Sequence, residues 1–161
     1  MITLLLALSA AQIPDEARLQ KAVLRAIQDE TGHVSSAIKR KDMDQYMDAV
    51  PNDYRIEEDD GSVTDKTGLR AKQTQAWALI TRTNRIDMTF SEIRLGCGGE
   101  CAFVKSRQRW DRQMLGRDGV TEFNVVTTQD HEEKWALQGS RWRQTFIKEL
   151  GGTVLVDGKP L

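Results

Sequence analysis

The sequence has few of the residues that bind metals. Its 161 residues include only two cysteines, Cys97 and Cys101, and two histidines, His33 and His131. A closed structural zinc site takes four ligands and would need all four of these residues, and no metal-binding repeat brings them together in the sequence. Glycine-rich phosphate loops, nucleophile elbows and Ser-His-Asp spacings are also absent. We therefore expect no metal site and no cofactor.

An excess of charge of one sign is lacking too. The 23 Lys and Arg residues nearly balance the 24 Asp and Glu residues, which leaves a formal net charge of -1. Proteins dedicated to nucleic acids usually carry a basic excess, so we expect no nucleic-acid partner. A hydrophobic content of 39% and a charged content of 29% are typical of one globular domain.

No hydrophobic run is long enough to cross a bilayer, which takes roughly 20 residues. The first run, Ile2 to Ala11, is shorter, so we expect no stable membrane span. Its length and its small-residue end suit a secretory signal segment, although no Lys or Arg precedes it. The alternative is an apolar N-terminal arm packed on the domain. We expect a signal segment or arm at 1–11, export to the periplasm or medium, a domain at 12–150 and a tail at 151–161.

The two cysteines bracket a short turn. Cys97 and Cys101 enclose Gly98-Gly99-Glu100, between two runs that resemble strands. Such a hairpin turn brings two Cα atoms within the roughly 4.4–6.8 Å that a disulfide needs, and an exported chain meets an oxidising compartment. We predict a Cys97–Cys101 disulfide, with free thiols as the alternative.

The first half of the domain has helical periodicity. Leu19, Val23, Ile27, Val34 and Ile38 recur at helical spacing, which predicts a long amphipathic helix whose apolar stripe faces a core.

Two further helices follow the long one. Asp42, with Gln45 three residues later, forms a capping box for a short helix that ends near Val50. Thr64 is the expected cap of a third helix, which carries an apolar stripe from Leu69 to Ile80.

The second half has the alternation of strands. From Ile86 to Leu95 the apolar parity changes, which predicts a β-bulge near Ser91-Glu92 and a sharp bend. Helices first and long sequential strands afterwards indicate an α+β domain, with three N-terminal helices packed in a strongly curved antiparallel sheet. The other expected strands are Tyr54 to Glu57, Ala102 to Arg112, Val120 to about Leu137, and Trp142 to Leu150.

Several motifs recur in a fixed order along the domain. They are Ala37-Ile38-Lys39-Arg40-Lys41-Asp42-Met43-Asp44, Asn52-Asp53-Tyr54-Arg55-Ile56, Gly61, Lys134-Trp135-Ala136-Leu137, Gly139 and Arg141-Trp142-Arg143. Their order resembles the nuclear transport factor 2-like superfamily, which includes SnoaL-like polyketide cyclases and ketosteroid isomerases. The resemblance implies a cone, in which a curved sheet encloses an apolar pocket, and pairing into a homodimer through the outer sheet face.

The resemblance also implies candidate acid–base residues. Glu58 falls on the position of the general base in the isomerases, whereas Val34 falls on the position of their oxyanion-stabilising tyrosine. Without that donor, ketosteroid isomerisation is disfavoured. Glu58 also lies in an acidic turn that solvent would cover. His131 is a second candidate base, with an exposed strand histidine as the alternative.

Aromatic residues are the candidates for a ligand pocket. We expect Tyr54, Trp77 and Trp110 to line it, while large aromatics also fill cores and dimer faces. Two functions follow. The first is a domain that binds a small apolar ligand or serves as a dimerising scaffold. The second is a cofactor-independent isomerase, cyclase or dehydratase-like lyase that uses Glu58 or His131 as its acid or base.

Overall fold

The computed structural model describes residues 13–161, so the expected signal segment at 1–11 lies outside the described residues. Three helices come in the order that the sequence predicts: α1 (Ile13–Arg40), α2 (Met43–Ala49) and α3 (Lys66–Leu79). Within residues 13–161, no helix is both long and apolar enough to cross a membrane.

The long helix forms where the apolar stripe predicts it. Val23, Ile27 and Ile38 are buried, whereas Leu19 is 46% exposed, so the buried part of the stripe begins one turn later than expected. Acidic residues in the first turn and basic residues in the last turn complement the helix dipole. The Asp42 side chain accepts a hydrogen bond from the Gln45 amide at 3.0 Å, which confirms the predicted cap of α2.

Seven strands form one curved sheet in the order β2-β1-β6-β5-β4-β3, with β7 paired to β6. All neighbours are antiparallel except β1 and β6, which run parallel. The α+β class with a strongly bent sheet is confirmed, and the parallel pair makes the sheet mixed. The strands are β1 (Arg55–Glu57), β2 (Val63–Asp65), β3 (Ile80–Gly96), β4 (Cys101–Leu115), β5 (Glu122–Gln138), β6 (Arg141–Val156) and β7 (Lys159–Pro160).

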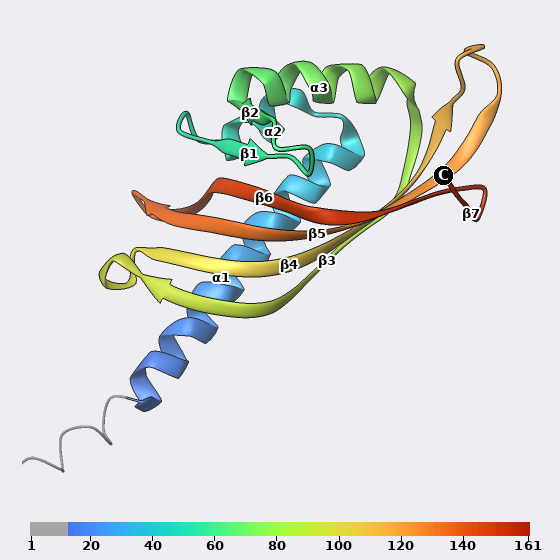
Figure 1. Ribbon diagram of the computed structural model, residues 1–161. Coiled ribbons are helices and arrows are strands. Elements are labelled where there is room, and N and C mark those ends of the chain that lie inside the picture. The colour runs from blue at the N-terminus through green and yellow to red at the C-terminus, as the bar shows by residue number, and fades with distance from the viewer. Residues whose placement is uncertain (1–12) are drawn as a thin grey trace, which may run out of the picture.

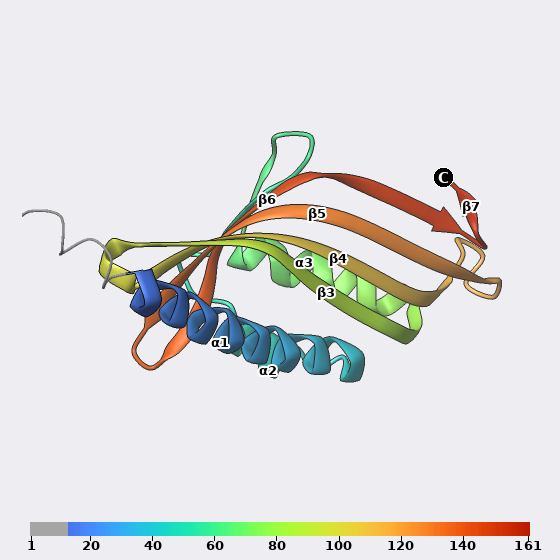
Figure 2. The same ribbon diagram turned by 90° about the horizontal axis from the view of Figure 1, so that it is seen from below.

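The sheet bends where the strand register shifts. The β3–β4 register shifts between Phe90 and Glu92, which confirms the predicted bulge. The β5–β6 register shifts twice, once between Gln129 and His131. Gly152 faces Gln129 there, and an added Cβ would lie 2.2 Å from the Thr128 carbonyl oxygen. Figures 1 and 2 show the four long strands twisting together, with α1 running across one face of the sheet.

Two details differ from the sequence-based expectations. Thr64 does not cap α3, because Asp65 accepts the hydrogen bond from the Gly68 amide while Thr64 lies in the short strand β2. Residues 151–156 continue β6 instead of forming a tail. Glycines indicate a break by propensity, and Gly151 has a φ of 99°, but pairing of Gly152 to Val156 with Val125 to Gln129 of β5 continues the strand.

Two clusters form the core. One joins α2, α3 and the end of α1 around Tyr46, Met47 and Trp77. The other packs α1 against the sheet through Ile27, Trp135 and neighbouring strand residues. Trp142 also belongs to this second cluster, so neither Trp135 nor Trp142 belongs to the outer sheet face.

The predicted disulfide is confirmed. Cys97 and Cys101 are joined at the β3–β4 turn, with Cα atoms 5.3 Å apart. The turn between them is a short 3-10 segment, Cys97–Gly99, in which Gly98 has a φ of 68°. Glycine adopts this left-handed conformation without the steric cost that a side chain would add.

Candidate ligand-binding cavity

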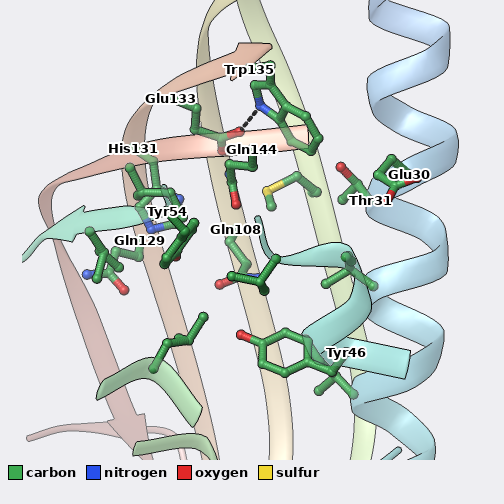
Figure 3. A pocket seen from close by; sticks show the side chains of 18 of the residues that line it. Glu30, Thr31, Tyr46, Tyr54, Gln108, Gln129, His131, Glu133, Trp135 and Gln144 are labelled. Carbon is green, nitrogen blue, oxygen red and sulfur yellow. Dashed lines mark hydrogen bonds between the residues drawn. The ribbon is translucent and has the colours of Figure 1, made fainter. Parts of the chain in front are cut away.

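A cavity of about 180 Å³ lies between the helices and the inner face of the sheet. Figure 3 shows α1 on one side of it, strand side chains on the other and Tyr46 of α2 below. The apolar part of the lining includes Val34, Ile38, Ile56, Leu69, Met88 and Ile147. The polar part supplied by the long strands consists of Gln108, Gln129, His131, Glu133, Gln144 and Glu149.

Strand β5 supplies the centre of the polar wall. Its side chains alternate between the two faces of the sheet, so Gln129, His131, Glu133 and Trp135 all point to the cavity. On the neighbouring strand β4, Ser106 pairs with His131 across the ladder. The period of two therefore places an imidazole, a carboxylate and an indole side by side along one wall.

Glu133 is the most deeply buried acid of this wall, with a relative exposure of 2%. The Trp135 Nε1–H donates to its Oε2 at 2.7 Å, as the dashed line in Figure 3 shows, and the Ser106 hydroxyl donates to its Oε1. Both donors are neutral. They orient the carboxylate without compensating its charge.

His131 is also buried, with a relative exposure of 6%. Its Nδ1 atom has no hydrogen-bond partner within residues 13–161. Burial lowers the pKa of His131 below its ordinary value of 6.5, although the charges of Glu133 and Asp130 act in the opposite direction. The imidazole is therefore neutral at pH 7, with one N–H donor and one acceptor nitrogen.

Two tyrosines add hydroxyl groups to the lining. Burial raises the pKa of Tyr46 to about 12, and burial together with nearby acidic groups raises the pKa of Tyr54. Both phenols stay protonated at neutral pH and can donate a hydrogen bond to a ligand. Burial also raises the pKa of Glu149, which accepts a hydrogen bond from the Asp59 amide at 3.4 Å.

Glu30 of α1 lies at another edge of the cavity, with its charge compensated. Arg141 donates to its Oε1 at 2.7 Å, and Arg143 lies 3.5 Å from the same atom. Arg143 also donates to the Asp48 backbone carbonyl at 2.6 Å, which joins α1, α2 and β6. Glu30 is therefore paired with two arginines that lie outside the lining.

The structure brings together some of the sequence-predicted site residues. Tyr54 and His131 line the cavity. Trp77 packs near Tyr46 at a ring distance of 5.8 Å in the core, and Trp110 packs against that core beneath Arg112. Neither tryptophan is among the lining residues, because Trp77 belongs to the core cluster and Trp110 packs against it.

Glu58 lies outside the cavity as well. Lys72 donates to its carboxylate, as does the Thr64 hydroxyl at 2.5 Å. The hydrogen bond from Lys72 is the main reason that the pKa of Glu58 lies below its ordinary value. A paired carboxylate with a lowered pKa is a weak base, so the geometry does not match the catalytic role that the resemblance implies.

Glu133, Trp135 and Glu30 were not among the expected site residues. The alternation of β5 contains the relevant signal, since Glu133 and Trp135 share the parity of His131. A carboxylate on an inward-facing parity is a candidate functional group, because burying a charge is costly unless it is paired and hydrogen-bonded, and carboxylates are therefore rarely buried. Within residues 13–161, no group of three or more His, Cys, Asp or Glu side chains is arranged to hold a metal ion.

Comparisons with known proteins identify the fold. No family model and no curated protein matches the sequence. Among solved structures, a putative scytalone dehydratase from Novosphingobium aromaticivorans has a TM-score of 0.69 at 8% identity, and the match covers 86% of this chain and 90% of that one. A hexachlorocyclohexane dehydrochlorinase (LinA) type 2 has a TM-score of 0.63 at 9% identity, covering 86% and 93%.

The description of a third similar structure names the fold. It is an NTF-2 like protein of unknown function from Shewanella oneidensis, with a TM-score of 0.58 at 16% identity, covering 78% of this chain and 97% of that one. At these identities the similarity concerns the fold. The helix order, the bent sheet and these matches agree that the chain has the nuclear transport factor 2-like fold.

Proposed function

We propose that this domain binds a small organic molecule of about one ring in the cavity between α1 and the sheet. The observation that carries the proposal is a partly open cavity with apolar walls, a few polar groups and one buried, unpartnered atom, His131 Nδ1. Ligand sites combine apolar walls with a few placed polar groups in this way. A volume of about 180 Å³ is close to that of the ~150 Å³ engineered cavity that accepts benzene.

A cavity-filling substitution tests this proposal. Val34 lines the cavity from α1, so Val34→Phe places a ring in the ligand volume. Isothermal titration with benzyl alcohol should detect binding to the wild type and none to Val34→Phe. Val63→Phe is the matched control, because Val63 is 64% exposed on β2. Equal binding by Val34→Phe and the wild type would contradict binding in this cavity.

A second candidate function is acid–base catalysis by His131, as in an isomerase, cyclase or dehydratase-like lyase. The observation in its favour is a neutral imidazole that lines the cavity together with two protonated tyrosines. His131 would take a proton from a carbon next to a carbonyl, and Tyr54 or Tyr46 would donate a hydrogen bond to the enolate oxygen. Two similar structures, described as a dehydratase and a dehydrochlorinase, support this class.

Proton exchange separates the two candidates. In deuterated buffer, a catalytic His131 should speed deuterium uptake at the α-carbon of cyclohexanone, measured by NMR. His131→Gln should abolish the enhancement, whereas Glu132→Gln, exposed on the same strand, should retain it. Binding without enhanced exchange by the wild type would favour the ligand-binding function alone.

We also propose a homodimer that forms through the outer face of the long strands. Phe103 of β4 and Phe146 of β6 lie half-buried on this face and line a groove there. Apolar groups on an outer face favour pairing. Sedimentation equilibrium should give twice 18.2 kDa for the wild type. Phe146→Glu should give a monomer, Val120→Glu should leave the dimer intact, and a monomeric wild type would refute the proposal.

Export to an oxidising compartment is a further part of the proposed role. The Cys97–Cys101 disulfide supports it, because such bonds persist mainly outside the reducing cytosol. N-terminal sequencing of the secreted or periplasmic protein tests it. We expect a mature chain that begins after Ala10 or Ala11, and an uncleaved chain in the cytosolic fraction would contradict export.

A further inference from the structure

The charges around the cavity are one-sided. Three glutamates, Glu30, Glu133 and Glu149, line it, whereas no lysine or arginine of residues 13–161 does. Arg141 and Arg143 compensate Glu30 from outside the lining. The other two carboxylates accept hydrogen bonds from neutral groups, the Trp135 indole and Ser106 hydroxyl for Glu133 and the Asp59 amide for Glu149.

A buried carboxylate without a cation is unstable unless something neutralises it. Removing a charge from water costs several kcal/mol, and a paired cation or hydrogen bonds must offset that cost. At 2% relative exposure, Glu133 has little solvent to do so. The hydrogen bonds from Trp135 and Ser106 offset part of that cost, but no lysine or arginine lines the cavity beside Glu133, so a positive charge on a ligand there would stabilise the carboxylate.

His131 gives an independent indication of the chemistry of a ligand that would bind beside Glu133. It is more than nine-tenths buried, it lines the same cavity, and its Nδ1 has no partner among the described residues. When the proton of a neutral imidazole is on Nε2, Nδ1 is an acceptor. With this tautomer, the wall offers a carboxylate and an unused acceptor nitrogen. A ligand group that donates hydrogen bonds and carries positive charge complements both.

From this geometry we propose that the cavity selects a small organic ammonium ion, a primary or secondary amine on a one-ring skeleton, with Glu133 as the group that recognises its charge. This inference rests on the proposed ligand-binding function. The ammonium N–H groups donate to the Glu133 carboxylate and to His131 Nδ1. Trp135, Tyr46 and Tyr54 also line the cavity, and aromatic faces attract cations.

Other ligand charges fit less well. A carboxylate ligand would meet Glu133 and Glu149 with like charge and no lysine or arginine to receive it. A neutral alcohol could donate to His131 Nδ1, but it would leave the charge of Glu133 uncompensated. An ammonium ion satisfies both groups at once.

Matched ligands test the proposal. We would titrate the full-length protein near neutral pH with benzylamine, benzyl alcohol and phenylacetate. A second set repeats the three functional groups on another carbon skeleton, so that the result does not depend on the benzyl group. It consists of cyclopentylamine, cyclopentanol and cyclopentanecarboxylate. We expect each amine to bind at least about tenfold more tightly than its alcohol, the size of effect that a hydrogen bond to a charged group gives. The carboxylates should bind more weakly than the alcohols.

Two variants assign the selection to Glu133. Glu133→Gln should bring the amine and alcohol affinities to within about twofold of each other. Glu132→Gln removes the same charge one residue away on the opposite, exposed face, so it should keep the full preference. The comparison of ligands on the wild type stands by itself if Glu133→Gln does not fold.

The possible results separate the selection for positive charge from ligand binding itself. If the alcohols bind as tightly as the amines, charge selection is refuted while ligand binding stands. If Glu133→Gln folds and keeps the amine preference, Glu133 is not the selecting group. If none of the six compounds binds at about 10 mM, the proposed ligand-binding function fails together with this inference.

Discussion

Replacing His131 by phenylalanine should make the folded protein more stable. A buried polar atom without a hydrogen-bond partner costs about 1–3 kcal/mol, and His131 Nδ1 is such an atom. Phenylalanine removes the polar atoms, and its additional ring volume extends into the adjacent cavity of about 180 Å³. Crowding of the core, the usual penalty of a larger side chain, is therefore small.

The magnitude follows from the lower part of that range. We expect the free energy of unfolding of His131→Phe to exceed that of the wild type by about 1 kcal/mol near pH 8, where the imidazole is neutral in both states. For a chain of this size, that difference raises the Tm by about 3 °C. Urea unfolding followed by tryptophan fluorescence measures it, and the same variant should lose binding of the ring-sized probes.

The advantage of the variant should increase as the pH falls. Burial lowers the pKa of His131 in the folded state below 6.5, so below that pH the unfolded chain binds a proton that the folded protein does not. Wild-type stability therefore falls as the pH drops from 6.5 toward the folded-state pKa, by at most about 1.4 kcal/mol per pH unit. His131→Phe lacks this loss. A variant that is less stable than the wild type both near pH 8 and below pH 6.5 would refute the reasoning.

Three further changes probe other parts of the structure. Cys97→Ser with Cys101→Ser should lower the free energy of unfolding by about 2 kcal/mol on the chain-entropy account of a short loop, measured in urea without reductant, and an unchanged midpoint would argue against the bond. Gly152→Ala should lower the Tm by at least about 3 °C in calorimetry, because its Cβ would approach a backbone carbonyl at 2.2 Å, and a neutral result would mean that the β5–β6 bulge adapts freely. Glu58→Gln should leave probe affinity within about twofold, since Glu58 pairs with Lys72 outside the cavity, and loss of binding in titration calorimetry would return Glu58 to the site.

Local patterns account for most of the fold. The stripe through Val23, Ile27 and Ile38 predicts α1, the Asp42 cap predicts the start of α2, and the parity change after Phe90 predicts the bulge. Each depends on interactions within a few residues, which sequence spacing records. The parallel pairing of β1 with β6 joins residues some 90 positions apart, and spacing contains no record of it.

The cavity was harder to predict because both faces of β5 carry apolar and polar residues. Only the packing of α1 decides which parity points inward, and it selects His131, Glu133 and Trp135. Trp77 and Trp110 fill the core instead, since their ring positions are fixed by α3 and β4 packing. Glu58 has the sequence position of an isomerase base. In the fold, however, Lys72 of α3 lies next to it and forms an ion pair with it outside the cavity.

The central claim is that the cavity between α1 and the sheet receives a small ligand beside His131. Met88 lines this cavity, and its methyl group is a site for selective ¹³C labelling. Nuclear Overhauser spectra of the labelled protein with bound benzylamine test the claim most directly. We predict contacts from the ring protons of the probe to the Met88 methyl and to the Trp135 indole. Contacts confined to Phe103 and Phe146 on the outer face of the sheet would contradict it.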